Sequence, residues 1–166
     1  MDSPTLKAMI QCEFNATPYP GDNNIVPEDS YNNVLESRQI ADYFRGRKWQ
    51  DITLADLREG YIGDPSACLT FMTPSAFRFY LPAYLFICIE SFSEADMIYD
   101  TTIRRLIIPN NSEDLLAFHE RFVPFTIKQK QIVAKFLRQM DLLHDGDRVG
   151  HDAKRALDGF WSSYLT

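Results

Sequence analysis

The stretch LTFMTPSAFRFYLPAYLFICIESF, residues 69–92, decides the fold. Within it, Thr73 and Pro74 predict the start of a helix, because a threonine N-cap accepts a backbone N–H and proline at the first helical position removes a donor that has no partner. Apolar side chains then cover both helical faces, and Arg78 is the only charged residue before Glu90. A helix that is apolar all round belongs in the interior. We therefore expect a central buried helix that begins at about Pro74.

Pro82 lies inside this helical pattern. It has no N–H to bond the carbonyl of Arg78, so we expect a kink there. A membrane span is a poor alternative, since the uninterrupted apolar run over residues 81–89 is far shorter than the roughly 20 residues needed to cross a bilayer. A ligand-lining helix that offers the hydroxyls of Tyr80 and Tyr84 is a second alternative, although aromatic stripes usually belong to the core.

Three segments of the chain carry a family resemblance. Residues 69–85 read LTFMTPSAFRFYLPAYL, residues 44–49 read FRGRKW, and residues 20–22 read PGD. Together they resemble the FRGxxW…FL(T/S)PEAFRYYLPAfL-type signature of a family of small bacterial proteins of unknown function, over roughly residues 10–143. Ser75 stands where that family usually has glutamate, so an acidic residue that would favour the helix N-terminus is missing. The resemblance implies a fold and a bacterial origin, and it identifies no catalytic residue.

The overall composition is that of an acidic globular protein. A length of 166 residues with 45% apolar side chains suits one domain with a substantial core. The net charge of −6 argues against nonspecific nucleic-acid binding, which needs clustered cations, and favours a basic partner. The first residues show no secretory signal pattern, and Cys12, Cys68 and Cys88 follow no Cys-x-x-Cys spacing. We therefore expect a cytoplasmic protein with reduced thiols that binds neither nucleic acid nor a membrane.

Other helices are expected on both sides of the central one. A left-handed Gly46 is expected to end a helix over residues 34–45. The amphipathic pattern is clearest over residues 126–143, where one face carries Lys and Arg side chains. The expected helix starts are Ser3 with Pro4, Thr53 with Asp56, Ser112, and Thr126.

Two segments between these helices read as irregular. Residues 15–33 are rich in proline, asparagine and aspartate, which predicts a long polar loop. Residues 144–152 read as a turn before a C-terminal helix that docks through an apolar stripe. The sequence therefore predicts an all-α protein in which residues 1–166 form one compact domain of six to eight helices around the kinked central helix.

Acidic side chains are the candidate contacts for a partner. Their alternative roles are to close turns in the loop and to form a solvated face after the central helix. No Gly-rich phosphate loop, nucleophile elbow or cofactor motif is present, so the leading hypothesis is not an enzyme but a small cytosolic protein-binding module. Such a module could be an immunity-type protein that neutralises a basic bacterial toxin by direct binding. The candidate contacts are Asp22, Glu28, Asp29, Glu94, Asp96 and Asp100.

A cluster of histidine and aspartate in the tail supports a second hypothesis. His144, Asp147, His151 and Asp152 could supply ligands to a divalent metal in a hydrolase, or bind a small ligand. Their spacing matches no motif of the His-Glu-x-x-His kind, and helix capping would explain them equally well.

A structural homo-oligomer is the third hypothesis. Its interface would use the basic face of residues 126–143 or the tail aromatics Phe160 and Trp161.

Overall fold

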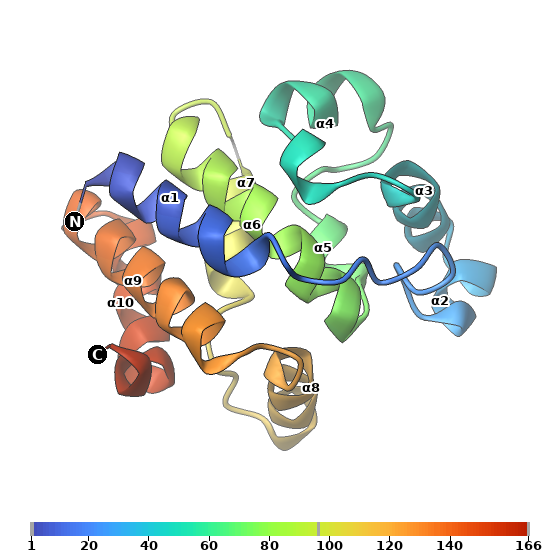
Figure 1. Ribbon diagram of the computed structural model, residues 1–166. Helices are drawn as coiled ribbons and strands as arrows, with labels where there is room; N and C mark the ends of the chain where they lie inside the picture. Colours follow the sequence, from blue (N-terminus) through green and yellow to red (C-terminus); the bar gives the residue numbers. More distant parts are fainter. Residues whose placement is uncertain (1, 96, 166) are drawn as a thin grey trace.

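The computed structural model describes residues 2–95 and 97–165 (Figure 1). Those residues form α-helices and two short 3-10 helices, with no strand among them, which confirms the all-α class. Six to eight helices were expected, and the described residues form ten α-helices, because α2 forms within the expected loop and the short α5 and α7 precede and follow the central helix. The helices are α1 (Ser3–Phe14), α2 (Glu28–Asn33), α3 (Leu35–Phe44), η1 (Trp49–Asp51), α4 (Leu54–Gly60), α5 (Cys68–Phe71), α6 (Pro74–Glu90), α7 (Met97–Arg104), α8 (Ser112–Phe122), α9 (Ile127–Leu143), α10 (Arg148–Gly159) and η2 (Trp161–Tyr164).

Helix α6 is the buried centre of the molecule, as its sequence predicts. The Thr73 hydroxyl accepts the N–H of Ala76, and the helix continues through Pro82 to Glu90. No helix in residues 2–95 and 97–165 is both long enough and apolar enough to cross a bilayer. The buried side chains of α6 are Ala76, Phe77, Phe79, Tyr80, Leu81, Pro82, Ala83, Tyr84, Leu85, Ile87 and Cys88.

The two tyrosines of α6 are satisfied within the protein. The Tyr80 hydroxyl donates to the carbonyls of Phe44, at 2.7 Å, and Arg47, at 3.0 Å, and that of Tyr84 donates to the carbonyl of Pro65. A buried hydroxyl with a protein partner stabilises the core and leaves no free donor for a ligand. The tyrosines therefore belong to the core and not to a ligand site.

Helices α1, α9 and α10 form a second layer that packs on α6 and α7 (Figure 1). The chain ends by turning into η2, where Trp161 is completely buried and its indole N–H donates to the Leu106 carbonyl at 2.7 Å. Because Trp161 is inside the molecule, it is unavailable for the homo-oligomer contact expected of it. Leu143, the last residue of the amphipathic helix α9, is 61% exposed.

The helix starts follow the expected chemistry, with two shifts of one residue. The capping box of Thr53 and Asp56 is present, and Gly46 has a positive φ of 69° after α3. At α1 the cap is Asp2 rather than Ser3, and at α8 it is Asn111 rather than Ser112. In both cases a short Asx side chain one position earlier accepts the N–H bond, which leaves the serine inside the first turn.

The three cysteines differ in environment, and this predicts their reactivity. Cys12 is exposed, whereas burial raises the pKa of Cys68 and of Cys88 to about 12 from the ordinary 9.0. Because the thiolate is the reactive form, this rise of three pH units lowers its population at pH 8 by roughly a thousandfold. In a disulfide-exchange assay at pH 8 we expect one thiol to react rapidly in the native protein and three after denaturation. Cys12→Ser should abolish the rapid phase, and two rapid thiols in the native protein would contradict the burial.

Candidate functional site

The segment between α1 and α2 is anchored to the rest of the protein. The side chains of Ile25 and Val26 are buried, and two bonds from Thr73 hold the backbone beside them. The Thr73 hydroxyl donates to the Asn24 carbonyl at 2.7 Å, and its N–H donates to the Ile25 carbonyl at 3.0 Å. The N-cap of α6 thus also fixes this segment.

The loop expected over residues 15–33 is shorter than its composition suggests. It ends at Pro27, because residues 28–33 form α2. Glu28 and Asp29 lie in the first turn of this helix, where negative charge is favourable. At the other end, the Arg38 guanidinium donates to the carbonyls of Tyr31, at 3.4 Å, and Asn32, at 3.3 Å, and so ties α2 to α3.

Tyr19 connects the loop to the end of α3. Its oxygen accepts the N–H of Gly46 at 2.7 Å, and its hydroxyl donates to Oδ1 of Asp22 at 2.6 Å. Its ring packs edge-on against Phe79, with 5.5 Å between centroids. Burial, and next the hydrogen bond to Asp22, raise the pKa of the Tyr19 hydroxyl, so it stays a protonated donor at neutral pH. The carboxylate of Asp22 is therefore held in a fixed position.

A groove lies between this loop, α2 and α3, at the right of Figure 1. We call it the α2–α3 groove, and its volume is about 430 Å³. Polar side chains at its rim surround an apolar floor made by the buried Ile25, Val26 and Ala41. The rim residues are Asp22, Asn23, Glu28, Tyr31, Asn32 and Arg45.

The charge of the groove is predominantly negative. Residues 20–36 contain four carboxylates and no Lys, Arg or His. Of the acidic candidates, Asp22 and Glu28 line the groove and are exposed, and the exposed Asp29 is the next residue after Glu28 in the first turn of α2. The cation at the rim, Arg45, already pairs with Asp42 at 3.4 Å, and a hydrogen bond to Tyr31 raises the pKa of its guanidinium. The groove can therefore receive a cationic side chain whose hydrocarbon stem contacts the apolar floor.

The other three acidic candidates do not join this site. Glu94 is exposed next to α7, where its backbone carbonyl accepts a hydrogen bond from Arg58. Asp96 lies outside the described residues. Asp100, expected on a solvated face, is only 2% exposed, so the expectation of a partner contact there is corrected.

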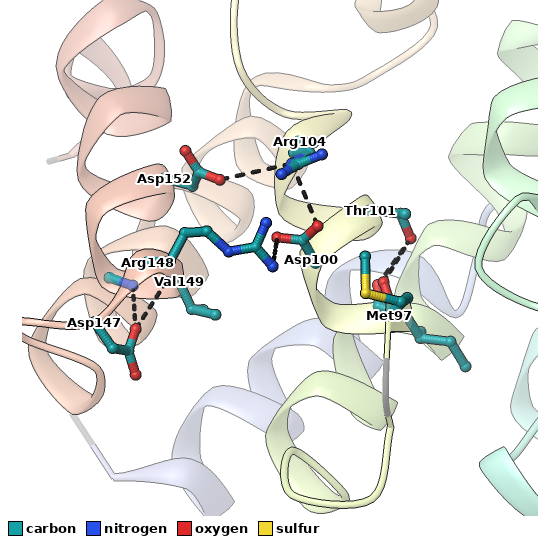
Figure 2. Close-up of polar contacts among 10 residues, drawn as sticks. Met97, Asp100, Thr101, Arg104, Asp147, Arg148, Val149 and Asp152 are labelled. Carbon is teal, nitrogen blue, oxygen red and sulfur yellow. Dashed lines mark hydrogen bonds and ion pairs between the residues drawn. The ribbon is translucent and has the colours of Figure 1, made fainter.

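Asp100 is instead the centre of a charged cluster between α7 and α10, shown in Figure 2. Its Oδ1 lies 3.0 Å from a guanidinium nitrogen of Arg148, and its Oδ2 lies 3.3 Å from Nε of Arg104. Nε of Arg104 also lies 3.7 Å from Asp152. We call these four residues the Asp100 cluster, and they hold α10 against α7.

The histidine and aspartate residues of the tail have separate structural roles. The His144 ring stacks on Phe92 at 3.7 Å between centroids, and its Nδ1 lies 3.3 Å from Oδ2 of Asp147. Oδ1 of Asp147 accepts the N–H groups of Val149, at 2.8 Å, and Gly150, at 3.0 Å, and these bonds lower the pKa of the carboxyl. Asp147 is thus the N-cap of α10, which begins at Arg148 and shortens the turn expected over residues 144–152.

This arrangement does not fit the metal site expected for the tail. His151 is exposed, and Asp152 is directed to Arg104 in the Asp100 cluster (Figure 2). Within residues 2–95 and 97–165, no three or more His, Cys, Asp or Glu side chains are grouped so that they could hold a metal ion. The candidate metal ligands therefore have separate roles: Asp147 caps α10, His144 stacks on Phe92, and Asp152 pairs with Arg104.

Comparison with known proteins places the chain in one group. A family model described as a family of unknown function, DUF6714, matches residues 3–165. The chain belongs to this family. The match runs from the first residue of α1 to just beyond η2, so the α2–α3 groove and the Asp100 cluster both lie inside it. No curated protein and no solved structure matches the chain.

Several residues that shape the α2–α3 groove were not found from the sequence. Tyr19 and Gly46 are 27 residues apart along the chain, and no local pattern connects them. The bonds of Arg38 and Arg45 to α2 depend on the fold, and no local pattern in the sequence indicates them. In the Asp100 cluster one signal was available, because Asp100 and Arg104 have the i, i+4 spacing of a helical ion pair.

Proposed function

We propose that the protein is a small cytosolic binding module whose α2–α3 groove receives a basic segment of a partner protein. One observation carries the proposal: two exposed carboxylates, of Asp22 and Glu28, lie at the rim of a groove of about 430 Å³ that has an apolar floor. A lysine or arginine side chain matches this arrangement, since its stem is apolar and its head is cationic. The volume is in the range of about 300–1,000 Å³ that ligand sites usually have.

The groove is prepared for binding before a partner arrives. Tyr19 holds the carboxylate of Asp22. Thr73 fixes the backbone of the loop at Asn24, and Arg38 fixes the backbone of α2 at Asn32. Fixing these groups in advance reduces the entropy that binding would otherwise cost. Next to the groove, Leu35 is 68% exposed at the junction of α2 and α3, and it would extend the apolar contact to the partner.

The partner class that fits best is a basic bacterial toxin, with this protein as its immunity partner. A net charge of −6 attracts a basic protein over a distance, and the acidic rim pairs with its cations on contact. Occupation of a toxin's active site by the groove would then block its substrate. This proposal also accounts for the absence of any established catalytic motif in the sequence.

Charge reversal at α2 tests this function. Glu28→Lys with Asp29→Lys is expected to weaken the complex by about 100-fold, because like charges placed together at an interface cost several kcal/mol. The partner to be tested is the protein encoded by the adjacent gene, co-expressed and purified, with affinity measured by calorimetry at two salt concentrations.

The matched control makes the same change in charge elsewhere. Glu59→Lys with Glu120→Lys alters two exposed carboxylates, on α4 and α8, away from the groove. This variant should bind within threefold of the unmodified protein. Equal weakening by both variants would show general electrostatics and no specific site, and unchanged binding by the α2 variant would remove the groove from the interface.

A further inference from the structure

Three arginines line a second cavity, which shares no residue with the α2–α3 groove, and one of them, Arg104, is already paired in the Asp100 cluster. The segment after α7, with Arg105, and one face of α8, with Arg121, line a space of about 210 Å³. Ile107 and Phe118 supply apolar surface, and Asp114 lies on the same face of α8. The two cavities have no lining residue in common, and α8 lies at the bottom of Figure 1 while α2 lies at its right.

Neither Arg105 nor Arg121 forms an ion pair within the part of the chain that the structure describes. Among the described residues, the ion pairs within 4.0 Å involve other side chains. Asp114 is seven residues from Arg121 on one helix, a separation of about 10 Å along the axis at 1.5 Å per residue. It is also hydrogen-bonded to the Asn111 amide at 2.7 Å, in the cap of α8.

The two cations are held in an unfavourable environment. Burial lowers the pKa of both guanidinium groups, and the charge of Arg105 lowers that of Arg121 further. The charge of Asp114 raises the pKa of both guanidinium groups, but it does not offset the lowering of the pKa by burial. Two half-buried like charges destabilise the protein unless an anion joins them.

Arg121 makes a cation–π contact, with its guanidinium carbon 5.3 Å from the centroid of the Phe77 ring. An arginine that lays its flat face on a ring keeps its N–H groups at the edges of the guanidinium plane. Those edges are the ones that bind two oxygens of one anion.

We propose that the cavity between Arg105 and Arg121 binds a phosphate-type dianion. The lining carries three guanidinium groups and the Asp114 carboxylate, a net charge of +2, which favours a phosphate or sulfate group over a single carboxylate. A volume of about 210 Å³ is below the range of about 300–1,000 Å³ of sites for drug-sized ligands, so the ligand is a free anion or one terminal group of a larger molecule. The site is independent of the partner groove.

Calorimetry with inorganic phosphate at constant ionic strength tests the site. We expect saturable binding to the full chain and a loss of affinity of about tenfold or more in Arg105→Gln and in Arg121→Gln, because each removes charge-assisted bonds. Arg138→Gln is the control, since Arg138 is exposed on α9 and lies outside the cavity. It should bind like the unmodified protein. No saturable binding, or equal loss in the control, would overturn the proposal.

Thermal unfolding separates a binding role from a structural one. Without phosphate, Arg105→Gln should keep or raise the melting temperature, because it removes one of two repelling charges. With phosphate, the unmodified protein should gain stability and this variant should gain much less. A lower melting temperature without phosphate would mean that Arg105 supports the fold instead. Sulfate should replace phosphate, and equal stabilisation by acetate would overturn the preference for a dianion.

Discussion

Trp161→Ala is expected to lower the free energy of unfolding by about 3–5 kcal/mol, the usual cost of removing a large buried aromatic side chain. Trp161 has no exposed surface. Its ring lies against Phe122 at 4.8 Å and Phe160 at 4.9 Å between centroids, and it joins η2 to α8. The substitution also leaves the Leu106 carbonyl without its indole donor, which adds to the cost of the cavity.

Urea unfolding followed by circular dichroism measures this effect. Trp161→Phe removes the hydrogen bond but keeps most of the aromatic volume, so we expect a smaller loss of about 1–2 kcal/mol. If the alanine variant does not fold, the phenylalanine variant still tests whether the tail docks through Trp161. Leu142→Ala is the surface control, with 66% of the leucine exposed, and should change stability by less than about 0.5 kcal/mol. A loss under 1 kcal/mol for Trp161→Ala would show that the tail is not docked as described.

The central helix could be predicted from the sequence because its signals are local. The Thr73 cap, the proline after it and the apolar run each identify α6 without knowledge of the rest of the chain. Burial on both faces followed from the same pattern, since Arg78 is the only charged residue that interrupts it before Glu90. The same holds for the capping box at Thr53 and for the positive φ of Gly46.

The loop before α2 shows where local reasoning stops. Its prolines and asparagines correctly indicate irregular backbone, yet they do not reveal that Ile25 and Val26 enter the core or that α2 follows. Those outcomes depend on Thr73, about fifty residues away along the chain. The acidic rim of the groove was found because carboxylates are visible in the sequence, whereas Tyr19 and Arg38, which shape it, act through distant backbone atoms.

Asp100 was misplaced for a related physical reason. A carboxylate near other acids usually reads as a solvated surface, because burial of an unpaired charge is costly. In the structure, Arg104 and Arg148 both pair with the Asp100 carboxylate, so its burial is compensated (Figure 2). Arg148 is far away in sequence, at the start of α10, so only the i, i+4 partner Arg104 could have been anticipated.

For the Asp100 cluster, we expect removal of the two arginine charges to lower the free energy of unfolding more than removal of the Asp100 charge. Arg104→Met with Arg148→Met is expected to lower the free energy of unfolding by about 3–5 kcal/mol, the usual cost of leaving one member of a buried ion pair alone. Asp100→Asn should cost less, since the two arginine side chains are 50% and 55% exposed and can turn to water, whereas Asp100 is buried.

A third variant decides whether the cluster stabilises the protein or only tolerates its own charges. Neither oxygen of Asp100 accepts a hydrogen bond from the described residues, so its charge depends on the two ion pairs alone. If that is so, adding Asp100→Leu to the Arg104→Met and Arg148→Met variant should restore most of the lost stability, because an apolar triad replaces the orphaned carboxylate. Urea unfolding of the double and triple variants measures the difference. A triple variant as unstable as the double would show instead that the arginine stems, and not the unpaired charge, hold α10 against α7.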